Sequence, residues 1–293
     1  MKIIFIGNYK GGVGKTTSTL FLGKHLSNNH GKTLLLDLDS QSSLSEMCIK
    51  KVPDITDLQE LDDNRTLNYI FDLEIENIKK GYNLDLKFDY DDLVYSYKDD
   101  LDFIPTKIDY KERLGLDELS MNMETDIRYF SILAKLIKNF EDTYEYLIID
   151  CPPSSNVITQ SAFLASDFYM IPTIVDAVST NGIIHYIATI NHTYSKYCIK
   201  HDDAYLYKHY FSKKPELLGI FYTLIRGQVK YDADKQRLTD NLAPSTYIFE
   251  NFTNNFVDIA RAVTDDTVES LPSNTDTYNL ITDEMIDRIN TFS

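Results

Sequence analysis

Hydrophobic residues along this chain gather in short, nearly continuous runs instead of alternating with polar ones. The six clearest runs are Lys2–Gly7, Thr33–Leu38, Leu101–Pro105, Tyr146–Asp150, Phe168–Pro172 and Leu217–Thr223. A strand without polar alternation is typically buried on both faces, as in a parallel sheet covered by helices. These runs therefore predict buried strands.

Helical spacing of apolar residues falls between the predicted strands. The expected helices are Thr16–Leu26, Asp126–Phe140, Val157–Ala165, Asn181–Tyr197 and Ala233–Leu242. A last amphipathic helix is predicted over residues 278–293, with an apolar face of Leu280, Ile281, Met285, Ile286 and Ile289. Strands that alternate with helices predict a doubly wound, mostly parallel α/β sheet with helices on both faces.

Residues 51–100 fit this alternation poorly, because they are acidic, rich in Asp and Tyr, and hold only short patterns such as Leu67–Ile78. We interpret them as an insertion that packs on the edge of a single domain spanning residues 1–293. Disorder is the alternative, but the many aromatic and leucine residues argue against it.

Composition narrows the classes of protein that the chain can represent. No apolar run approaches the roughly 18 residues that a membrane-spanning helix needs, and the short first run lacks a signal-peptide cleavage site. Cys48, Cys151 and Cys198 have no metal-binding spacing, which suits a reducing cytoplasm and three small buried side chains. We therefore expect a cytoplasmic protein without a membrane partner.

The segment from Lys10 to Thr17, KGGVGKTT, connects the first predicted strand to the first predicted helix. Glycines let backbone N–H groups approach phosphate oxygens, and a helix N-terminus attracts anions. The sequence predicts a phosphate-binding loop formed by Gly11, Gly12, Val13, Gly14, Lys15, Thr16 and Thr17. Lys15 would bridge the β and γ phosphates of ATP, the Thr16 hydroxyl would bind Mg²⁺, and Thr17 would reach the α phosphate.

The usual glycine five places before Gly14 is replaced by Tyr9, and a lysine, Lys10, follows it. This loop resembles the deviant Walker A box of the ParA/MinD family. The resemblance implies that Lys10 crosses a dimer interface to the phosphates of the partner's nucleotide. The alternative is a solvated loop lysine.

Two further segments carry the resemblance. Leu34–Gln41 is similar to the second family box, with Ser40 in place of the expected proline, and Leu147–Ser154 is similar to the Walker B segment. The resemblance implies that Asp39 orients the attacking water, that Asp37 supports the Mg²⁺ site and that Asp150 holds the ion through water.

The resemblance implies an ATPase for plasmid or chromosome segregation. Such a chain would form an ATP-dependent homodimer, bind DNA without reading its sequence and hydrolyse ATP faster with a ParB-type partner. A nucleotide-gated positioning or scaffold ATPase with a non-DNA cargo is the alternative. A nitrogenase-reductase-like enzyme is disfavoured because the chain lacks a paired-cysteine cluster site.

Three features bear on how far the resemblance to family members extends. The stretch Glu250–Asn255 lacks the proline and basic residues that family members have here, which puts the adenine and DNA contacts of this region in question. Lys10 lies near the start, so we expect no operator-binding domain before it. The C-terminus lacks a strongly basic amphipathic helix, which argues against MinD-type membrane attachment.

The charge distribution bears on DNA binding. The net charge is −16, and residues 51–126 hold 21 acids against 9 bases, whereas residues 196–240 hold 9 bases against 6 acids. The predicted DNA-binding residues are Arg226, Lys230, Lys235 and Arg237. A DNA-coating protein should present lysine and arginine, so the total charge favours the scaffold alternative while the later segment favours DNA. The four residues could instead form an ordinary solvated surface.

Overall fold

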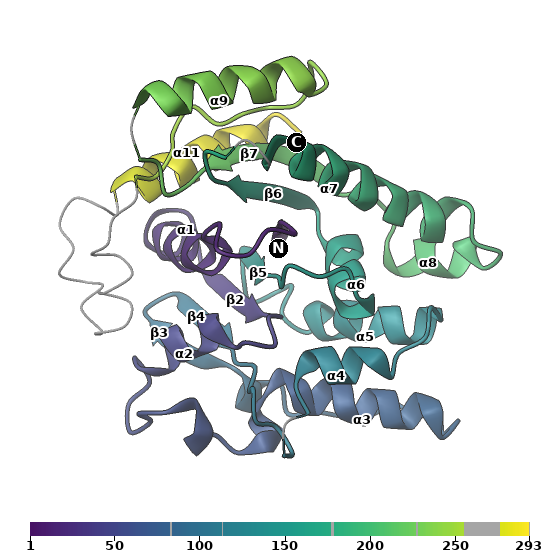
Figure 1. Ribbon diagram of the computed structural model, residues 1–293. Coiled ribbons are helices and arrows are strands. Elements are labelled where there is room, and N and C mark those ends of the chain that lie inside the picture. Colours follow the sequence, from purple (N-terminus) through teal and green to yellow (C-terminus); the bar gives the residue numbers. More distant parts are fainter. Residues whose placement is uncertain (83, 113, 177–178, 227, 255–275, 293) are drawn as a thin grey trace.

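The computed structural model describes residues 1–292 except 83, 113, 177–178, 227 and 255–275. Its centre is a sheet in the order β3-β4-β2-β5-β1-β6-β7 (Figure 1). The strands are β1 (Lys2–Ile6), β2 (Thr33–Asp37), β3 (Tyr95–Lys98), β4 (Leu101–Ile104), β5 (Tyr146–Asp150), β6 (Phe168–Thr173) and β7 (Glu216–Tyr222). All neighbouring strands run parallel except β3, which pairs antiparallel with β4. This architecture confirms the predicted doubly wound, mostly parallel α/β fold.

Helices cover both faces of the sheet. The helices are α1 (Lys15–Asn29), α2 (Ser43–Ile49), α3 (Leu67–Lys79), α4 (Leu116–Met121), α5 (Ile127–Lys138), α6 (Val157–Ala165), α7 (Ser179–Tyr194), α8 (Ala204–Tyr210), α9 (Gln228–Asn241) and α11 (Asp276–Asn290). A π-helical turn, Ser195–Ile199, extends α7. Every predicted strand and helix is present, with ends shifted by a few residues.

Successive apolar residues of the inner strands β1, β2 and β5 enter two separate hydrophobic clusters. Ile3 and Phe5 of β1 pack with α3 to α9 on one face, whereas Ile4 and Ile6 pack with α1, α2 and α11 on the other. This division follows from the pleat, which sends neighbouring side chains to opposite faces. The continuous apolar runs are therefore explained by burial on both sides.

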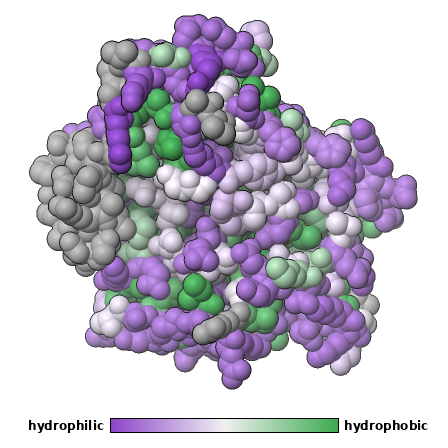
Figure 2. Space-filling model, in the orientation of Figure 1, coloured by the Kyte–Doolittle hydropathy of each residue, from purple (hydrophilic) through white to green (hydrophobic). Residues whose placement is uncertain are grey.

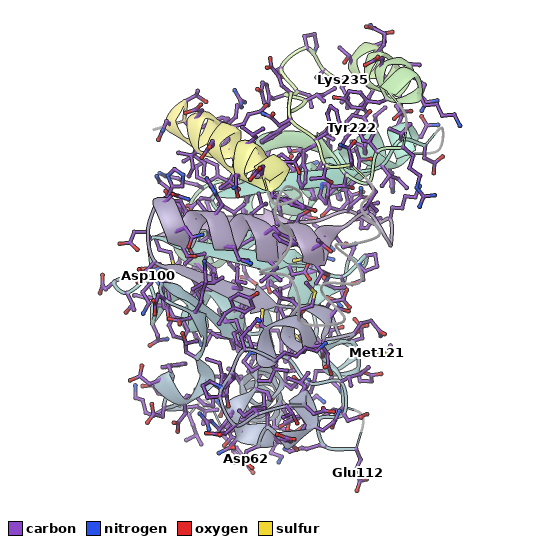
Figure 3. The ribbon with its side chains drawn as sticks, turned by 90° about the vertical axis from the view of Figure 1, so that its left-hand side faces the viewer. Asp62, Asp100, Glu112, Met121, Tyr222 and Lys235 are labelled. Carbon is purple, nitrogen blue, oxygen red and sulfur yellow. The ribbon has the colours of Figure 1, made fainter. Side chains whose placement is uncertain are left out.

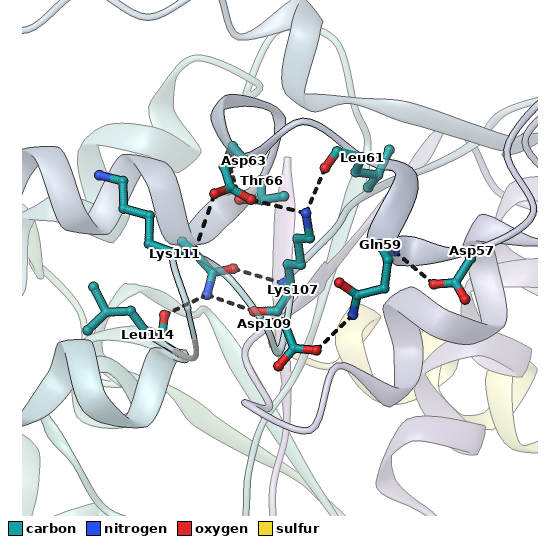
Figure 4. Close-up of polar contacts among 10 residues, drawn as sticks. Asp57, Gln59, Leu61, Asp63, Thr66, Lys107, Asp109, Lys111 and Leu114 are labelled. Carbon is teal, nitrogen blue, oxygen red and sulfur yellow. Dashed lines mark hydrogen bonds and ion pairs between the residues drawn. The ribbon is translucent and has the colours of Figure 1, made fainter.

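Residues 51–100 build one edge of the molecule. Helix α3 buries Leu67, Ile70, Phe71 and Ile75 in the larger cluster, and β3 forms the outermost strand. The following segment holds them in place through Lys107, which is 7% exposed (Figure 4). Its ammonium donates to the carbonyl of Leu61 at 2.8 Å and pairs with Asp63 at 3.0 Å. A buried cation thus anchors part of the acidic segment.

The C-terminal region follows the prediction with one correction. Ile281, Met285 and Ile289 of α11 are buried against α1, and Tyr278 stacks on Phe21 with centroids 5.1 Å apart. Leu280 was expected on this face but is 51% exposed, because Tyr278 and Thr282 take the inward positions of that turn. The prediction for Leu280 was wrong.

The opposite edge of the sheet is also occupied. Residues 247–253 run beside β7, where the Ile220 N–H donates to the Tyr247 carbonyl at 3.0 Å and the Phe249 N–H donates to the Ile220 carbonyl at 2.9 Å. Isolated bridges join Ile220 to Ile248 and Ile225 to Asn254. Asn255, the last residue of the departure noted above, lies outside the described residues. Polar side chains cover most of the visible surface, with small apolar patches between them (Figure 2).

Candidate nucleotide-binding site

The phosphate loop lies at the carboxyl end of β1, in the centre of the sheet. Gly12 and Gly14 have φ values of 71° and 75°, which are left-handed conformations that favour glycine. A Cβ added to Gly12 would meet nothing within 4 Å, so open space lies beside the loop. Helix α1 begins at Lys15, directly after Gly14, and no side chain of the described residues caps its first N–H groups. The free N–H groups of a helix N-terminus attract anions. The geometry fits an anion such as a phosphate.

Lys15 is buried to 7% exposure at the base of the loop. Its ammonium donates to the carbonyl of Lys10 at 3.1 Å, which curls the loop around the lysine. Burial lowers the pKa of Lys15, while the charges of Asp150 and Asp39 oppose that shift. A desolvated cation with few partners is suited to binding a polyphosphate.

Asp150 ends β5, opposite Ile6 of β1 and Asp37 of β2. Neither of its buried carboxylate oxygens has a hydrogen-bond partner within the described residues. Burial raises the pKa of Asp150 well above its ordinary range, the charge of Asp37 adds to the rise, and the nearby Thr16 hydroxyl opposes it. An orphaned carboxylate beside a hydroxyl provides only oxygen donors, which is the ligand type that Mg²⁺ prefers. The residues present therefore fit a magnesium ion.

Asp37 is fully buried but well satisfied. Its carboxylate accepts bonds from the N–H of Asp39 at 3.1 Å, the N–H of Ser45 at 2.8 Å and the hydroxyl of Ser45 at 2.7 Å. Burial raises its pKa to about 7 despite these bonds. Asp37 thus fixes the turn into α2 and adds negative charge next to Asp150, so it suits a supporting role at the metal site.

Asp39 lies two residues after the end of β2 and is half-buried. Its carboxylate accepts a hydrogen bond from the N–H of Gln41 at 3.0 Å. The adjacent Ser40 hydroxyl donates to Asp117, at the start of α4. The side chain of Asn156, which caps α6 after β5, donates to the same Asp117 at 3.1 Å. Asp117 therefore links the turn that carries Asp39 to the segment that follows Asp150. No local motif predicts this link, because Ser40 and Asp117 are 77 residues apart.

Lys10 pairs with Asp176, on the segment between β6 and α7. The backbone carbonyl of Asp176 accepts from the guanidinium of Arg237 at 3.1 Å. Tyr9, the residue that departs from the usual loop, packs edge-on against Tyr186 of α7 with centroids 4.7 Å apart. Contacts with α7 and with the segment before it thus position Tyr9 and Lys10 at the start of the phosphate loop.

Thr223 supports the loop from β7 and was not predicted as a site residue. Its hydroxyl donates to the Val13 carbonyl at 2.8 Å, and its methyl carbon would lie 3.8 Å from a Cβ on Gly14. The only signal was its position at the end of a predicted strand. Thr223 connects the nucleotide loop to the edge of the sheet where α9 begins.

The four predicted DNA-binding residues do not form one cationic surface. Arg226 and Lys230 are exposed. Lys235 turns inward, where its ammonium lies 3.4 Å from the Phe249 carbonyl and 5.7 Å from the centre of the Tyr231 ring. Arg237 pairs with the buried Asp234 and also donates to Thr180 at 3.3 Å. The structure divides the set into two exposed and two half-buried cations.

Comparison with known proteins identifies the family. A family model described as an AAA domain, AAA_31, matches residues 1–201. The chain belongs to this family. The sporulation initiation inhibitor protein Soj of Bacillus subtilis is 29% identical over 192 residues, which cover 64% of each chain. A virulence plasmid ParA family protein of Chlamydia psittaci is 29% identical over 175 residues, covering 58% of this chain and 56% of that protein. The chain thus matches less than two thirds of the length of these relatives.

Solved structures with the same fold extend over nearly the whole chain. A Cyanothece McdA variant in complex with ATP superposes with a TM-score of 0.72, 20% identity, and coverage of 99% of this chain and 96% of McdA. A putative plasmid partition protein of Borrelia burgdorferi bound to AMPPNP superposes with a TM-score of 0.69 and 20% identity. The match covers 100% of this chain and 99% of that protein. The AAA_31 match and the ParA-like relatives confirm the resemblance to ParA/MinD-like P-loop ATPases. No helix among the described residues is long and apolar enough to cross a membrane.

Proposed function

We propose that this AAA_31 protein is a ParA-type ATPase that segregates DNA. Mg-ATP would join two chains face to face, the dimer would bind DNA without sequence preference, and a ParB-type partner would stimulate hydrolysis and release. The observation that carries this proposal is the position of Lys10, whose ammonium pairs with Asp176 on the segment between β6 and α7. The ParA-like relatives support it.

The proposed hydrolysis rests on positioning and charge. The N–H groups of the loop and the buried ammonium of Lys15 would hold the phosphates. Thr16 and Asp150 would hold Mg²⁺, which neutralises phosphate charge when bound. Asp39, half-buried and near enough to influence Lys15, would orient the water that attacks the γ phosphate. Asp117 would keep that carboxylate in register with the segment after Asp150.

Lys10 would exchange partners during the cycle. In the single chain the side chains of Lys10 and Asp176 are each about one third exposed, at 35% and 34%. An ion pair of this exposure contributes only about 0.2–1 kcal/mol, so a phosphate of the partner's nucleotide can displace Asp176 at small cost. The ion pair with Asp176 would position Lys10 in the monomer, and it is weak enough to break when the dimer forms.

The test is ATP-dependent dimerisation measured by light scattering with Lys10→Ala and Asp176→Asn variants. Lys10→Ala should bind ATP as a monomer and lose both dimer and turnover. Asp176→Asn should dimerise at an ATP concentration up to about fivefold lower, because Lys10 no longer leaves an ion pair. Lys230→Ala, which removes an exposed lysine, is the control and should behave as wild type. A fully active Lys10→Ala dimer would make Lys10 an ordinary loop residue.

A nucleotide-gated scaffold ATPase with a non-DNA cargo is the second candidate. The net charge of −16 favours it. Helix α9 also carries as many acids as bases, three of each, so it is not a basic helix. A DNA-binding titration with ATP at low salt separates the two candidates, since the scaffold would bind no DNA under conditions that form the dimer.

A further inference from the structure

Two histidines and an aspartate meet where the last helix crosses the first, far from the phosphate loop. His25 lies in α1, His30 directly follows it, and Asp283 comes from α11. One ligand atom from each lies within 4.8 Å of the other two. In Figure 3 α11 is seen lying along α1, which agrees with the many contacts between the two helices. Residues about 250 positions apart thus present three metal-ligand side chains to one point.

We propose that His25, His30 and Asp283 bind a divalent cation of the zinc class. The Nε2 atoms of His25 and His30 lie 2.8 Å and 3.4 Å from the same carboxylate oxygen of Asp283. Ligands of a tetrahedral Zn²⁺ with bonds of about 2.0–2.1 Å are separated by roughly 3.3 Å. The two distances to Asp283 bracket that value, and the ligand atoms of His25 and His30 lie within 4.8 Å of each other, so side-chain rotations can bring all three to one ion.

The chemistry of the ligands selects the ion. Imidazole nitrogen suits Zn²⁺ and neighbouring transition metals, whereas Mg²⁺ takes oxygen ligands. Three protein ligands leave a fourth position for water, which the exposure of Asp283, 54%, allows. This site therefore differs in its preferred ion from the Thr16 and Asp150 site.

Partial burial favours a site over an accidental contact. The side chains of His25 and His30 are 12% and 25% exposed, and their ring centroids are 5.7 Å apart. The amide nitrogen of Asn29 lies 3.3 Å from Nδ1 of His25. Binding an ion through Nε2 leaves the ring proton on Nδ1, so the amide of Asn29 would have to turn away or present its oxygen to that proton. The two rings are therefore partly fixed by their surroundings, and Asp283 is the most mobile of the three ligands.

A bound ion would fasten α11 to the end of α1 remote from the nucleotide. Helix α1 runs 15 residues from Lys15 to Asn29, so its two ends are roughly 20 Å apart. The metal would connect the C-terminal helix to the helix that begins the phosphate loop without touching the phosphates. Its binding should be independent of Mg-ATP.

The experiment uses the full chain without an affinity tag, stripped of metal and free of nucleotide. Co²⁺ should give the intense visible absorption of a tetrahedral site, Zn²⁺ should displace it, and Zn²⁺ should raise the unfolding temperature. Asp283→Asn and His25→Ala should weaken Zn²⁺ binding by at least about 10-fold. His209→Ala removes an exposed histidine of α8 and is the matched control.

The outcomes separate this site from other causes. Loss of cobalt absorption in Asp283→Asn, with an unchanged circular dichroism spectrum and unchanged ATP binding, supports the assignment. Because Asp283 is exposed, its variant should fold even where His25→Ala does not. Equal Zn²⁺ affinity in wild type and Asp283→Asn, or only the weak spectrum of six-coordinate Co²⁺, would overturn it.

Discussion

Charged residues play opposite parts in two regions: the carboxyl end of the sheet, where the phosphate loop lies, and the surface of helix α9. At the carboxyl end of the sheet Lys15 and Asp150 are both buried. The ammonium of Lys15 donates to the Lys10 carbonyl, and the Asp150 oxygens have no hydrogen-bond partner in the part of the chain that the structure describes. On α9, Lys235 and Arg237 are half-buried and directed to protein groups. Figure 3 shows Lys235 at the α9 end of the molecule, opposite Asp62 and Glu112.

The difference separates a ligand site from a surface inferred by charge alone. Unpaired buried charges are costly, and they persist where a ligand completes them. Charges that already have protein partners contribute to the fold and offer little to a ligand. A count of lysines and arginines therefore overstates the positive charge that α9 presents to DNA. The phosphate-loop motif, in contrast, identified charged residues that remain available to bind a ligand.

The largest effect should come from Lys15→Ala. Loss of the buried ammonium should weaken ATP binding at least about 100-fold, or ~3 kcal/mol, and turnover should disappear. Titration with a fluorescent ATP analogue measures this, with Lys230→Ala as the control for loss of one positive charge. If Lys15→Ala bound ATP as tightly as Lys230→Ala, the buried lysine would be no more important for the ligand than an exposed lysine of α9.

Asp39→Ala should retain ATP binding but hydrolyse ATP about 10²- to 10⁴-fold more slowly. The substitution removes the water-orienting carboxylate and leaves the phosphate loop intact. Phosphate release measures turnover, and size exclusion should show accumulated ATP-bound dimer. The exposed Asp89→Ala is the control, and normal hydrolysis by Asp39→Ala would assign the role to another residue.

Asp150→Asn should stabilise the nucleotide-free protein at about pH 8 by about 1–3 kcal/mol while Mg²⁺-dependent turnover is lost. Burial raises the pKa of this carboxyl above its ordinary value of 3.8, so its folded form favours the proton. The stability from that proton is present below the unfolded pKa and is lost as pH rises through the folded pKa.

Urea unfolding in EDTA at about pH 5 and about pH 8 checks this prediction. The wild type should lose more stability over this range than Asp150→Asn does. Asp37, whose pKa is raised to about 7, adds a loss of the same sign in both proteins. A variant less stable than wild type at the higher pH would show that Asp150 is not an uncompensated charge.

Arg226→Glu with Lys230→Glu should weaken ATP-dependent DNA binding and lower its salt slope by about 2 per chain, with ATPase activity unchanged. Both residues are exposed on α9 or just before it. Fluorescence anisotropy over a salt series measures the slope. An unchanged slope would place any DNA surface elsewhere.

Arg237→Gln should have the smallest effect. It should lower the free energy of unfolding by about 1–2 kcal/mol, because the buried Asp234 loses its cation and the Asp176 carbonyl loses a donor. The salt slope of DNA binding should stay the same. A slope that falls as in the double variant would return Arg237 to the DNA surface.

Much of the fold could be predicted from the sequence because the strands are buried on both faces and their apolar runs are local. The three motif segments lie at the carboxyl ends of β1, β2 and β5. These strands are parallel neighbours, so their carboxyl ends come together at one side of the sheet. The connections Ser40–Asp117, Lys10–Asp176 and Val13–Thr223 span 77, 166 and 210 residues. No local pattern encodes such pairs. Leu280 failed because helical spacing alone did not show which residues of that turn face α1.

Among the described residues, neither edge of the central sheet presents a long uncovered strand. β3 is a short antiparallel strand followed by the charged Asp99 and Asp100, and residues 247–253 occupy the outer side of β7. Open edges are templates for aggregation, and short or covered edges prevent it. At the high local concentration of a filament or a coated surface, copies of this chain should therefore meet through side chains and bound nucleotide, and not by extending one another's sheet.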